Sequence, residues 1–570
     1  MRADSLATKC VSQYRSRDIF AYLAIRYCLE SDIARKDAWV EQNAVQVVLG
    51  SPKGSYIRSY HFKQIDDNGA IENRELFVPG VTEALAEASL LAACASHAKS
   101  YSLKSVFSYR PTGREDRSAY FEQYMVGLRQ RQHGIAEACA ANPDGVVVYT
   151  DIERFYPSIS FELAKHHWLR FCKAAELDIR YNDLGLKLIE NYKQRADGDG
   201  LLTGPMFCHF LANLVLCEID AFAQTLPVHY FRYVDDMTLV GSEQDVHHSV
   251  SAIAEKLAEI GLKTHPMHSS KTLVVPVGQW LRSTEDFLSG HHAVAWMRLI
   301  GDIKKTLLFD SEKSAAIEDA MTAEGFRLPI PDYVIAITEL TAFQKVRRLG
   351  LWNWLRFKTR KVTIETIVID ARTLSDRLFH ETRAILTSPR VTDKYEQKRV
   401  VSKLRYRLGR LIYIGNEKQL TALRSLLASW RELTFYSAII DALLTEDCSR
   451  VVAMGANVSQ ATAQVFRPAL KTARFSKPVV GETEVQGLAV FILNGVPVEA
   501  EVASPNHPLL RFARGPVDAE LMKSPRGLLQ ELACLHGLGE TRHAEVLRSA
   551  FDVDENIILD ALEMDYGYYL

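Results

Sequence analysis

The sequence predicts a mixed α+β N-terminal half followed by an all-α C-terminal half. Between residues 101 and 278, short apolar strand patterns alternate with amphipathic helix patterns and glycine-rich turns. From residue 280 onward the strand patterns fade, and amphipathic helices follow one another. With 570 residues, of which 47% are apolar, the chain can form two or three domains. We therefore expect three regions, at residues 1–140, 141–280 and 281–570.

The first hundred residues contain apolar helical stretches around one polar segment. That segment, SPKGSYIRSYHFKQIDDNGAIENRE, is typical of strands joined by turns. Further along, the apolar strand GVVVYT leads directly into Asp151. The glycine-flanked loop ADGDGLLTGP then precedes a helix with one apolar face, formed by Phe207, Phe210, Leu211, Leu214 and Val215.

The next segment, HYFRYVDDMTLVG, has two short apolar strands around a tight acidic turn, which predicts a β-hairpin. After it, Ser242 has the position of a helix N-cap, and Gly261 stands just beyond the expected end of that helix. The apolar residues between them recur at spacings of four and three: Val246, Val250, Ile253, Leu257 and Ile260. A final strand, KTLVVPV, follows.

The C-terminal half is expected to be helical. One clear helix precedes Gly415 and carries a regularly spaced apolar set: Val400, Val401, Leu404, Leu408, Leu411 and Ile412. Helix pairs of this kind indicate a HEAT-like or other α-repeat stack, although the sequence shows no clean repeat period.

Charge and cysteine content exclude several classes of protein. The 68 basic residues nearly cancel the 70 acidic ones, so any nucleic-acid surface must be local. The nine cysteines are scattered and form no Cys-x-x-Cys pattern, which argues against a zinc module or a disulfide framework. The sequence shows no signal-peptide core and no run of ~18 apolar residues. We expect a cytoplasmic protein without membrane association.

Three carboxylates are the first candidates for chemistry. Asp151 ends a buried strand, Asp235 and Asp236 occupy the hairpin tip, and antiparallel pairing would bring all three to one sheet edge. Adjacent buried aspartates are costly without cations, because like charges repel and burial raises their pKa values. Carboxylates from different strands hold the two Mg²⁺ ions, ~3.5–4 Å apart, of two-metal phosphoryl-transfer sites. Taken alone, the pair would more simply be an ordinary Asp-rich turn.

Four segments in series outweigh that simpler interpretation. TDIERFYPSI, GLLTGPMFCHFLANLVL, FRYVDDMTLVG and GLKTHPMHSSKT resemble, in order and spacing, palm motifs A, B, C and D of reverse transcriptases. The resemblance implies an α+β right-hand polymerase with fingers and palm, followed by a helical thumb and C-terminal domain. It also implies an RNA-directed DNA polymerase, a nucleotidyltransferase that adds dNTPs to a 3′ hydroxyl.

Carried over residue by residue, this resemblance assigns a metal site. Asp151 and Asp235 would be the principal metal ligands, Asp236 the third carboxylate, and the backbone carbonyl of Ile152 a further ligand. The cofactors implied are two Mg²⁺ ions, with Mn²⁺ as an alternative.

The same resemblance assigns residues around the incoming nucleotide. Tyr156 matches the aromatic gate that blocks a ribose 2′ hydroxyl, the alternative being a core tyrosine. Thr203, Gly204 and Pro205 fall in the loop that supports the templating base and the nucleotide, where glutamine is commoner than Thr203. Gly204 allows a close backbone approach that a Cβ would obstruct.

Several cations are candidates for contact with the triphosphate. Lys271 resembles the motif D lysine that protonates pyrophosphate, with Lys263 competing for that role. In the fingers-like segment SVFSYRPTGR, Arg110 is the first candidate and Arg114 the second, because a planar guanidinium suits phosphate oxygens. The alternative for these arginines is a solvated surface position.

Four features resemble bacterial abortive-infection and other defence-associated reverse transcriptases. They are SYR in the fingers-like segment, DIERFYPSI, the RYVDD hairpin and a long helical C-terminal half. This resemblance implies a homo-oligomer that makes DNA in antiphage defence, in some members without a template or from a protein primer. Three alternatives remain: a retron-like or intron-like enzyme that copies an RNA template, an RNA polymerase with the same palm geometry, which Tyr156 disfavours, and a catalytically silent polymerase fold that acts as a scaffold or sensor.

Two basic segments occur in the helical half. KVRRLGLWNWLRFKTRK combines cations with aromatic residues, as single-strand binding requires. Its candidates for nucleic-acid contact are Arg356, Lys358, Arg360 and Lys361. The alternative is an amphipathic helix with snorkelling cations. A second basic run, from Lys394 to Arg410, is interpreted as one solvated helix face.

A protein primer would be a tyrosine. The C-terminal tail offers Tyr566, Tyr568 and Tyr569 at a chain end, where mobility is common. The helical Tyr413 is an equal alternative, and the simpler interpretation that none of these tyrosines primes is favoured over both.

Overall fold

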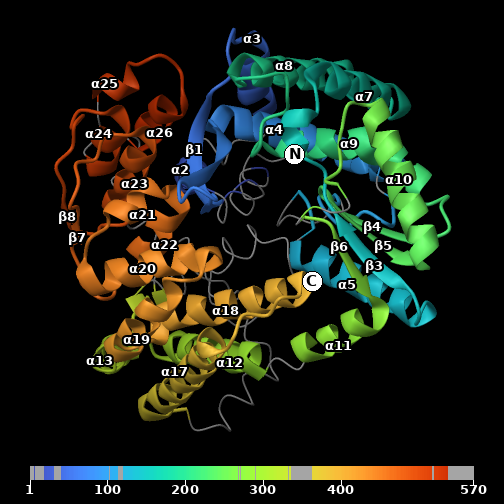
Figure 1. The fold of residues 1–570 in the computed structure, drawn as a ribbon. Helices are drawn as coiled ribbons and strands as arrows, with labels where there is room; N and C mark the ends of the chain where they lie inside the picture. The colour runs from blue at the N-terminus through green and yellow to red at the C-terminus, as the bar shows by residue number, and fades with distance from the viewer. Residues whose placement is uncertain are drawn as a thin grey trace.

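The computed structural model describes residues 18–30, 40–101, 103–112, 120–122, 124–266, 271–288, 291–331, 333–334, 362–515 and 519–536, together with residues 6, 10, 14 and 269. Within these ranges the protein has the expected mixed α+β N-terminal half and helical C-terminal half (Figure 1). The predicted polar strands are confirmed as the antiparallel pair β1 (Tyr56–Ile65) and β2 (Ile71–Pro79).

A four-stranded antiparallel sheet with strand order β4-β5-β3-β6 forms the centre of the N-terminal half. β3 (Val146–Thr150) lies between β5 (Asp236–Gly241) and β6 (Leu273–Pro276), while β4 (His229–Tyr233) pairs with the other side of β5. The predicted strands, the hairpin and their antiparallel pairing are thereby confirmed.

Helices pack against this sheet, against the β1–β2 hairpin and against one another. Those of the N-terminal half are α2 (Ile19–Glu30), α3 (Val45–Gly50), α4 (Val81–Cys94), α5 (Tyr124–Ala141), α6 (Phe155–Ser158), α7 (Phe161–Ala174), α8 (Ile179–Arg195), α9 (Met206–Ala223), α10 (Glu243–Glu259) and α11 (Val277–Leu288). The π-helix η2 (Val40–Ala44) and the 3₁₀ helix η3 (Ala95–Ser100) complete this half.

The C-terminal half consists of helices apart from one pair of two-residue strands, β7 (Ala473–Arg474) and β8 (Val498–Glu499), within the part that the structure describes. Its helices are α12 (His291–Phe309), α13 (Ser314–Ala323), α17 (Ile364–Thr387), α18 (Lys394–Ile414), α19 (Glu417–Leu427), α20 (Thr434–Thr445), α21 (Ser449–Ala453), α22 (Ala456–Phe466), α23 (Glu482–Leu493), α24 (Pro508–Arg514), α25 (Ala519–Met522) and α26 (Leu528–His536). Two 3₁₀ turns are η4 (Ser311–Lys313) and η5 (Arg431–Leu433).

Strand alternation gives the central sheet two different faces. Val146 and Val148 lie in the main core, with apolar residues of α9 and α10. Val147 and Val240 face the other way, into a smaller core built from α5, β6 and α11. Tyr395 of α18 is buried in this smaller core. The C-terminal half therefore contacts the second face of the sheet.

The helix after the hairpin shows how local sequence determines an element. Ser242 Oγ accepts a hydrogen bond from the Asp245 N–H at 3.1 Å, which satisfies one of the exposed amides at the start of α10. Gly261, with φ of 80°, lies just beyond the last turn, where the backbone enters the left-handed region. The predicted cap, apolar face and end of this helix are confirmed.

The hydrophobic cores do not divide at residue 280. The main core combines the N-terminal helices and the central sheet with residues of α23, α24 and α26, and α26 contacts α2 (Figure 1). Arg526, just before α26, forms ion pairs with the buried Glu83 of α4 and with Glu531 of α26. A second core fills the helical half and includes Phe62 of β1. The predicted domain boundaries therefore describe sequence regions rather than separately packed bodies.

One helix in the described residues, α9, has the length and apolar composition of a membrane span, and 78% of it is buried inside the protein. Polar residues such as Asn213 and Asp220 lie along it and form hydrogen bonds with other parts of the protein. It is the central core helix of the N-terminal half.

Candidate active site

The three predicted carboxylates lie at one end of the central sheet. The ladder between β3 and β5 ends with the pair Thr150 and Met237, so the next position would place Asp151 opposite Asp236. Side chains at such opposite positions in antiparallel strands are ~4.5–5.5 Å apart at Cβ, and like charges there repel. Asp235 precedes Asp236 in the hairpin loop. The predicted approach of the three carboxylates is thus confirmed by the register.

Burial disfavours the ionised form of each of these carboxylates. It is the main cause of the raised pKa of Asp151. Burial, together with the nearby charge of Asp151, raises the pKa of Asp235 to about 6. Burial and the adjacent Asp235 carboxylate raise the pKa of Asp236 to about 7. Cations would relieve both the desolvation and the mutual repulsion.

Five basic groups act on these carboxylates, and they come from four parts of the chain: β2, α5, the loop between α10 and β6, and α18. The charge of Arg74 on β2 lowers the pKa of Asp235, and that of Arg131 on α5 lowers the pKa of Asp236. His265 lowers the pKa of Asp151 in the same way. Lys271 acts on both Asp151 and Asp235, and Lys398 of α18 acts on both Asp151 and Asp236. Each of these groups opposes the rise in the carboxylate pKa values. Arg74, Arg131, His265 and Lys398 were not predicted.

Of the two lysines predicted for motif D, Lys271 is the one whose charge acts on the carboxylates. It lies in the loop before β6, at an exposed position. Lys263, its competitor, uses its backbone carbonyl to accept a hydrogen bond from the Glu153 N–H at 2.8 Å. The role of Lys271 in proton transfer remains a prediction.

Lys398 reaches the site because α18 docks against the sheet. Asp393, the N-cap of α18, accepts a hydrogen bond from the Gln279 side chain of α11 at 3.4 Å. Tyr395 is 3% exposed in the core shared with β6 and α11. Lys398 follows Tyr395 by three residues and therefore lies on the same helix face. Figure 1 shows α18 running from the helical half toward α11 and β6.

The basic run from Lys394 to Arg410 is therefore not one solvated face, and that interpretation was wrong. Arg410 is 7% exposed and lies over the Tyr406 ring. Arg407 forms an ion pair with Glu381 of α17 at 2.7 Å. The cations of this helix serve several buried and half-buried contacts.

The segment after Asp151 is fastened to the loop that follows α10. The backbone carbonyl of Asp151 accepts from the His265 N–H at 3.1 Å, and Ile152 forms a β-bridge with Thr264. The carbonyls of Asp151 and Lys263 make the hydrogen bonds of this bridge, so the Ile152 carbonyl takes no part in them. His265 also lies between two carboxylates, with Nε2 3.7 Å from Asp151 Oδ1 and Nδ1 3.5 Å from Glu153 Oε1.

The donor set fits divalent cations. Asp151 Oδ1 is buried and accepts no hydrogen bond from any described residue. The three aspartates offer the hard carboxylate oxygens that Mg²⁺ prefers. No group of three His, Cys, Asp or Glu side chains is already arranged to hold a metal in the described residues. Two-metal sites complete their shells with substrate phosphates and water, so a looser protein set agrees with this chemistry.

Tyr156 belongs to an aromatic cluster that spans three elements. Its hydroxyl shares a hydrogen bond of 2.5 Å with His209 Nδ1 of α9. The His209 ring stacks on Tyr109, with centroids 4.1 Å apart and planes at 6°. Tyr156 is half-buried, whereas His209 is 4% exposed. Tyr156 lies on α6, directly after the Asp151 segment, and its role as a gate stays a prediction.

The predicted loop of Thr203, Gly204 and Pro205 leads into α9 and contacts β2. The Thr203 carbonyl accepts a hydrogen bond from the Phe77 N–H at 2.7 Å. Gly204 has φ of 125°, and a Cβ there would lie 2.5 Å from the Phe77 carbonyl oxygen. The close approach predicted for this glycine is therefore to a neighbouring strand, which joins the loop to the β1–β2 hairpin.

Arg110 is held by its own segment. Its guanidinium donates to the carbonyls of Val106 and Lys104 and to Gln130 Oε1, and lies 4.3 Å from the Phe107 ring centroid. Burial lowers its pKa. The arginine whose charge lowers the pKa of Asp235 is Arg74, and contact of Arg110 with a triphosphate stays a prediction. The polar sequence around Arg74 in β2 does not indicate this effect on Asp235.

Other predicted residues lie away from the site or outside the described residues. Tyr413 is 1% exposed in the second core and donates to Gln464, so it lies in the core of the helical half rather than at the sheet edge. Arg114, the tail tyrosines and the nucleic-acid candidates are outside the described residues: Arg356, Lys358, Arg360, Lys361, Tyr566, Tyr568 and Tyr569.

No protein-family model matches this sequence, and no curated protein matches it either.

Proposed function

We propose that this protein is a polymerase of the reverse-transcriptase type with a right-hand fold, which adds dNTPs to a 3′ hydroxyl. One observation carries the proposal: Asp151, Asp235 and Asp236 meet at one edge of a sheet, where burial raises the pKa values of all three. Clustered groups with such raised pKa values are typical of functional sites. The order of the four motifs supplies the reaction type.

Asp151 and Asp235 would hold the metal ions, with Asp236 as the third carboxylate and the Ile152 carbonyl beside them. Two bound Mg²⁺ ions, or Mn²⁺, would activate the attacking hydroxyl and stabilise the charge on the phosphates. The charges of Arg74, Lys271 and Lys398 lower the pKa values of the carboxylates. Once bound metal ions neutralise the carboxylates, these cations would be suited to bind the phosphates of a nucleotide.

Tyr156 would select deoxynucleotides. Its hydroxyl is fixed by His209, and His209 is fixed by stacking on Tyr109, so the ring has little freedom to move aside for a 2′ hydroxyl. A rigid aromatic side chain close to the metal ligands is the arrangement that such a gate requires.

The DNA product, an RNA template or none, a homo-oligomeric state and a role in cytoplasmic antiphage defence are proposed from the resemblance of the sequence. The packing of α18 against the sheet supports a functional link between the helical half and catalysis. The cations near Arg356 would then guide nucleic acid.

The direct test is synthesis by the purified full chain. Each dNTP is supplied with Mg²⁺, alone and with a primed RNA template, and parallel reactions receive the four NTPs. We expect DNA from dNTPs and little product from NTPs, and sequencing the product shows whether a template was copied. Label that stays on the protein after denaturation identifies a protein primer. Absence of product under all these conditions would contradict the proposal.

If a protein primer is found, its position can be tested by truncation. Deleting residues 566–570 removes the three tail tyrosines, and Tyr413→Phe is the matched variant in the helical core. Loss of covalent label from the truncated chain alone would assign priming to the tail. Covalent DNA on the truncated chain would exclude the tail.

A further inference from the structure

The hairpin turn that carries Asp235 has an unusual backbone. Tyr233 pairs with Asp236 at the end of the ladder between β4 and β5, so Val234 and Asp235 form a two-residue loop. Val234 has φ of 56°, in the left-handed region that β-branched residues rarely adopt and where glycine is usual. Such a conformation persists only where the surrounding structure holds it.

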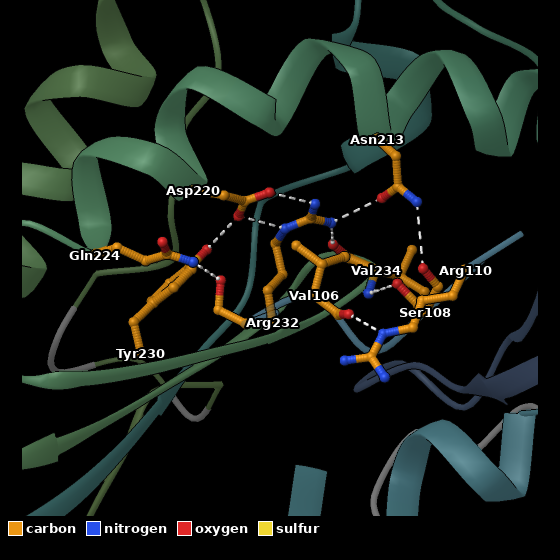
Figure 2. A network of polar contacts seen from close by, with 10 residues as sticks. Val106, Ser108, Arg110, Asn213, Asp220, Gln224, Tyr230, Arg232 and Val234 are labelled. Carbon is orange, nitrogen blue, oxygen red and sulfur yellow. Dashed lines mark hydrogen bonds and ion pairs between the residues drawn. The ribbon is translucent and has the colours of Figure 1, made fainter. Parts of the chain in front are cut away.

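Two buried side chains hold the two polar groups of Val234. Ser108 Oγ accepts a hydrogen bond from the Val234 N–H at 2.7 Å, and Arg232 Nη1 donates to the Val234 carbonyl at 2.8 Å (Figure 2). Ser108 is 2% exposed and Arg232 is 1% exposed. Both bonds are therefore shielded from competition with water.

Arg232 is itself fixed by α9. Its Nε and Nη2 donate to the two carboxylate oxygens of Asp220 at 2.7 and 2.6 Å, and its Nη1 also donates to Asn213 at 3.1 Å. Tyr230 donates to the same Asp220 carboxylate at 2.9 Å. A bidentate pair of this kind fixes the plane of the guanidinium as well as its position. The arginine thus transmits the rigidity of α9 to the turn.

Ser108 belongs to a segment that runs beside β4. The Arg232 N–H donates to the Ser105 carbonyl at 2.8 Å, and the Phe107 N–H donates to the Arg232 carbonyl at 2.9 Å. Asn213 of α9 donates to the Ser108 carbonyl at 3.2 Å. The next residue, Tyr109, stacks on His209 of the aromatic cluster. One segment therefore touches both the turn that carries Asp235 and the aromatic cluster that contains Tyr156.

We propose that Ser108 and Arg232 are positioning residues that hold the strained turn at Val234 in the conformation that Asp235 needs to bind a divalent cation. This inference rests on the proposed function. Without these two partners the turn would relax toward a conformation with negative φ, and the Asp235 carboxylate would point elsewhere.

Ser108→Ala is the cleanest variant, because substituting Arg232 would leave Asp220 as an unpaired buried charge and could unfold the protein. Ser105→Ala is the matched control. Ser105 is also buried, lies three residues earlier in the same segment, and accepts a hydrogen bond from Gln224 at 2.7 Å rather than from the turn. Ser108→Thr, which keeps the hydroxyl, serves as the conservative variant.

Two measurements are made on the full chain. The first is amide hydrogen exchange of the peptide containing Val234, without metal. The second is Mn²⁺ binding followed by electron paramagnetic resonance, without nucleotide. Ser108→Ala should speed exchange of the turn and weaken Mn²⁺ binding on the order of five- to tenfold, the effect of one buried hydrogen bond. Ser105→Ala should match the wild type in both, and Ser108→Thr should restore both.

Unchanged exchange of the turn in Ser108→Ala would overturn the positioning role, whatever the protein catalyses. Faster exchange with unchanged Mn²⁺ binding would overturn the link between the turn and the metal. Failure of the wild type to bind Mn²⁺ would instead overturn the proposed function, and exchange of the turn would still separate the two failures.

Discussion

Glu87, a buried carboxyl of α4 beside the start of α9, makes the stability of the protein depend on pH in a defined direction. It is 0% exposed on α4, and Oε1 accepts hydrogen bonds from Tyr192 at 2.9 Å and Tyr56 at 3.2 Å. Oε2 accepts from the Phe207 N–H at 3.3 Å, at the first turn of α9. Burial nevertheless outweighs these bonds and raises the pKa of Glu87 to about 7.

The sign follows from proton linkage. The folded state binds the Glu87 proton more tightly than the unfolded state, in which the pKa is near 4.5. Its stabilising contribution is therefore complete below pH 4.5 and is lost as pH rises through about 7. Because a tenfold change in proton affinity is worth about 1.4 kcal/mol, the contribution is about 3 kcal/mol.

Glu87→Gln removes this dependence, since glutamine stays neutral. Losing the acceptor for the Phe207 N–H lowers the free energy of unfolding of the variant by the same amount at every pH. Between pH 5 and pH 8, the free energy of unfolding of the variant should therefore rise by about 3 kcal/mol relative to that of the wild type. Urea unfolding followed by tryptophan fluorescence measures both proteins. The exposed Glu255→Gln is the control, and its difference from the wild type should stay flat. Parallel curves for Glu87→Gln and the wild type would refute the reasoning.

Three further predictions concern the site and its surroundings. Tyr156→Val should admit ribonucleotides, because a smaller side chain leaves room for the 2′ hydroxyl; an unchanged ratio of NTP to dNTP incorporation would place the gate elsewhere. Lys398→Met should raise the KM for dNTPs roughly tenfold without weakening Mn²⁺ binding, because it removes a cation suited to phosphate; an unchanged KM would show that Lys398 only balances the carboxylates. The last change replaces the four clustered cations by glutamine: Arg356, Lys358, Arg360 and Lys361. It should weaken nucleic-acid binding and flatten its salt dependence, and an unchanged slope would make the cluster an ordinary helix surface.

Local sequence patterns predicted the elements that carry the carboxylates. The apolar strand before Asp151, the hairpin around Asp235 and the capped helix after Ser242 each depend on neighbours within a few residues, and all three are confirmed. The approach of the carboxylates also followed, because an antiparallel pairing fixes the register once the strands are identified. HEAT-like repeats, the metal ions and the reaction stay predictions.

The surroundings of the carboxylates could not be predicted, because they come from distant parts of the chain. Arg74 lies in a polar strand and Lys398 in a basic helix, and nothing within a few residues of either indicates an aspartate 160 residues away. The basic run of α18 has the local pattern of a solvated face. Only the packing of Tyr395 against the sheet turns one side of that helix toward the site.

The composition of the hydrophobic cores could not be predicted either, because it also depends on contacts between distant parts of the chain. Periodicity predicted helices in the C-terminal half, but it does not say which other helices they pack against. The contact of Arg526 with Glu83 joins residues 443 positions apart and draws the last described helices onto the N-terminal ones. A boundary at residue 280 follows the change in secondary structure and not the packing.

The central claim is that Asp151 and Asp235 bind the metal ions of a polymerase. Asp151→Asn and Asp235→Asn each remove a negative charge with little change in volume, and the exposed Asp144→Asn, at the other end of β3, is the matched control. Incorporation of labelled dNTPs with Mg²⁺ is measured for all four proteins, after thermal unfolding has confirmed that each is folded. We expect incorporation by the wild type and by Asp144→Asn, and none by either of the other variants. Incorporation at the wild-type rate by Asp151→Asn and Asp235→Asn would contradict the two-metal assignment.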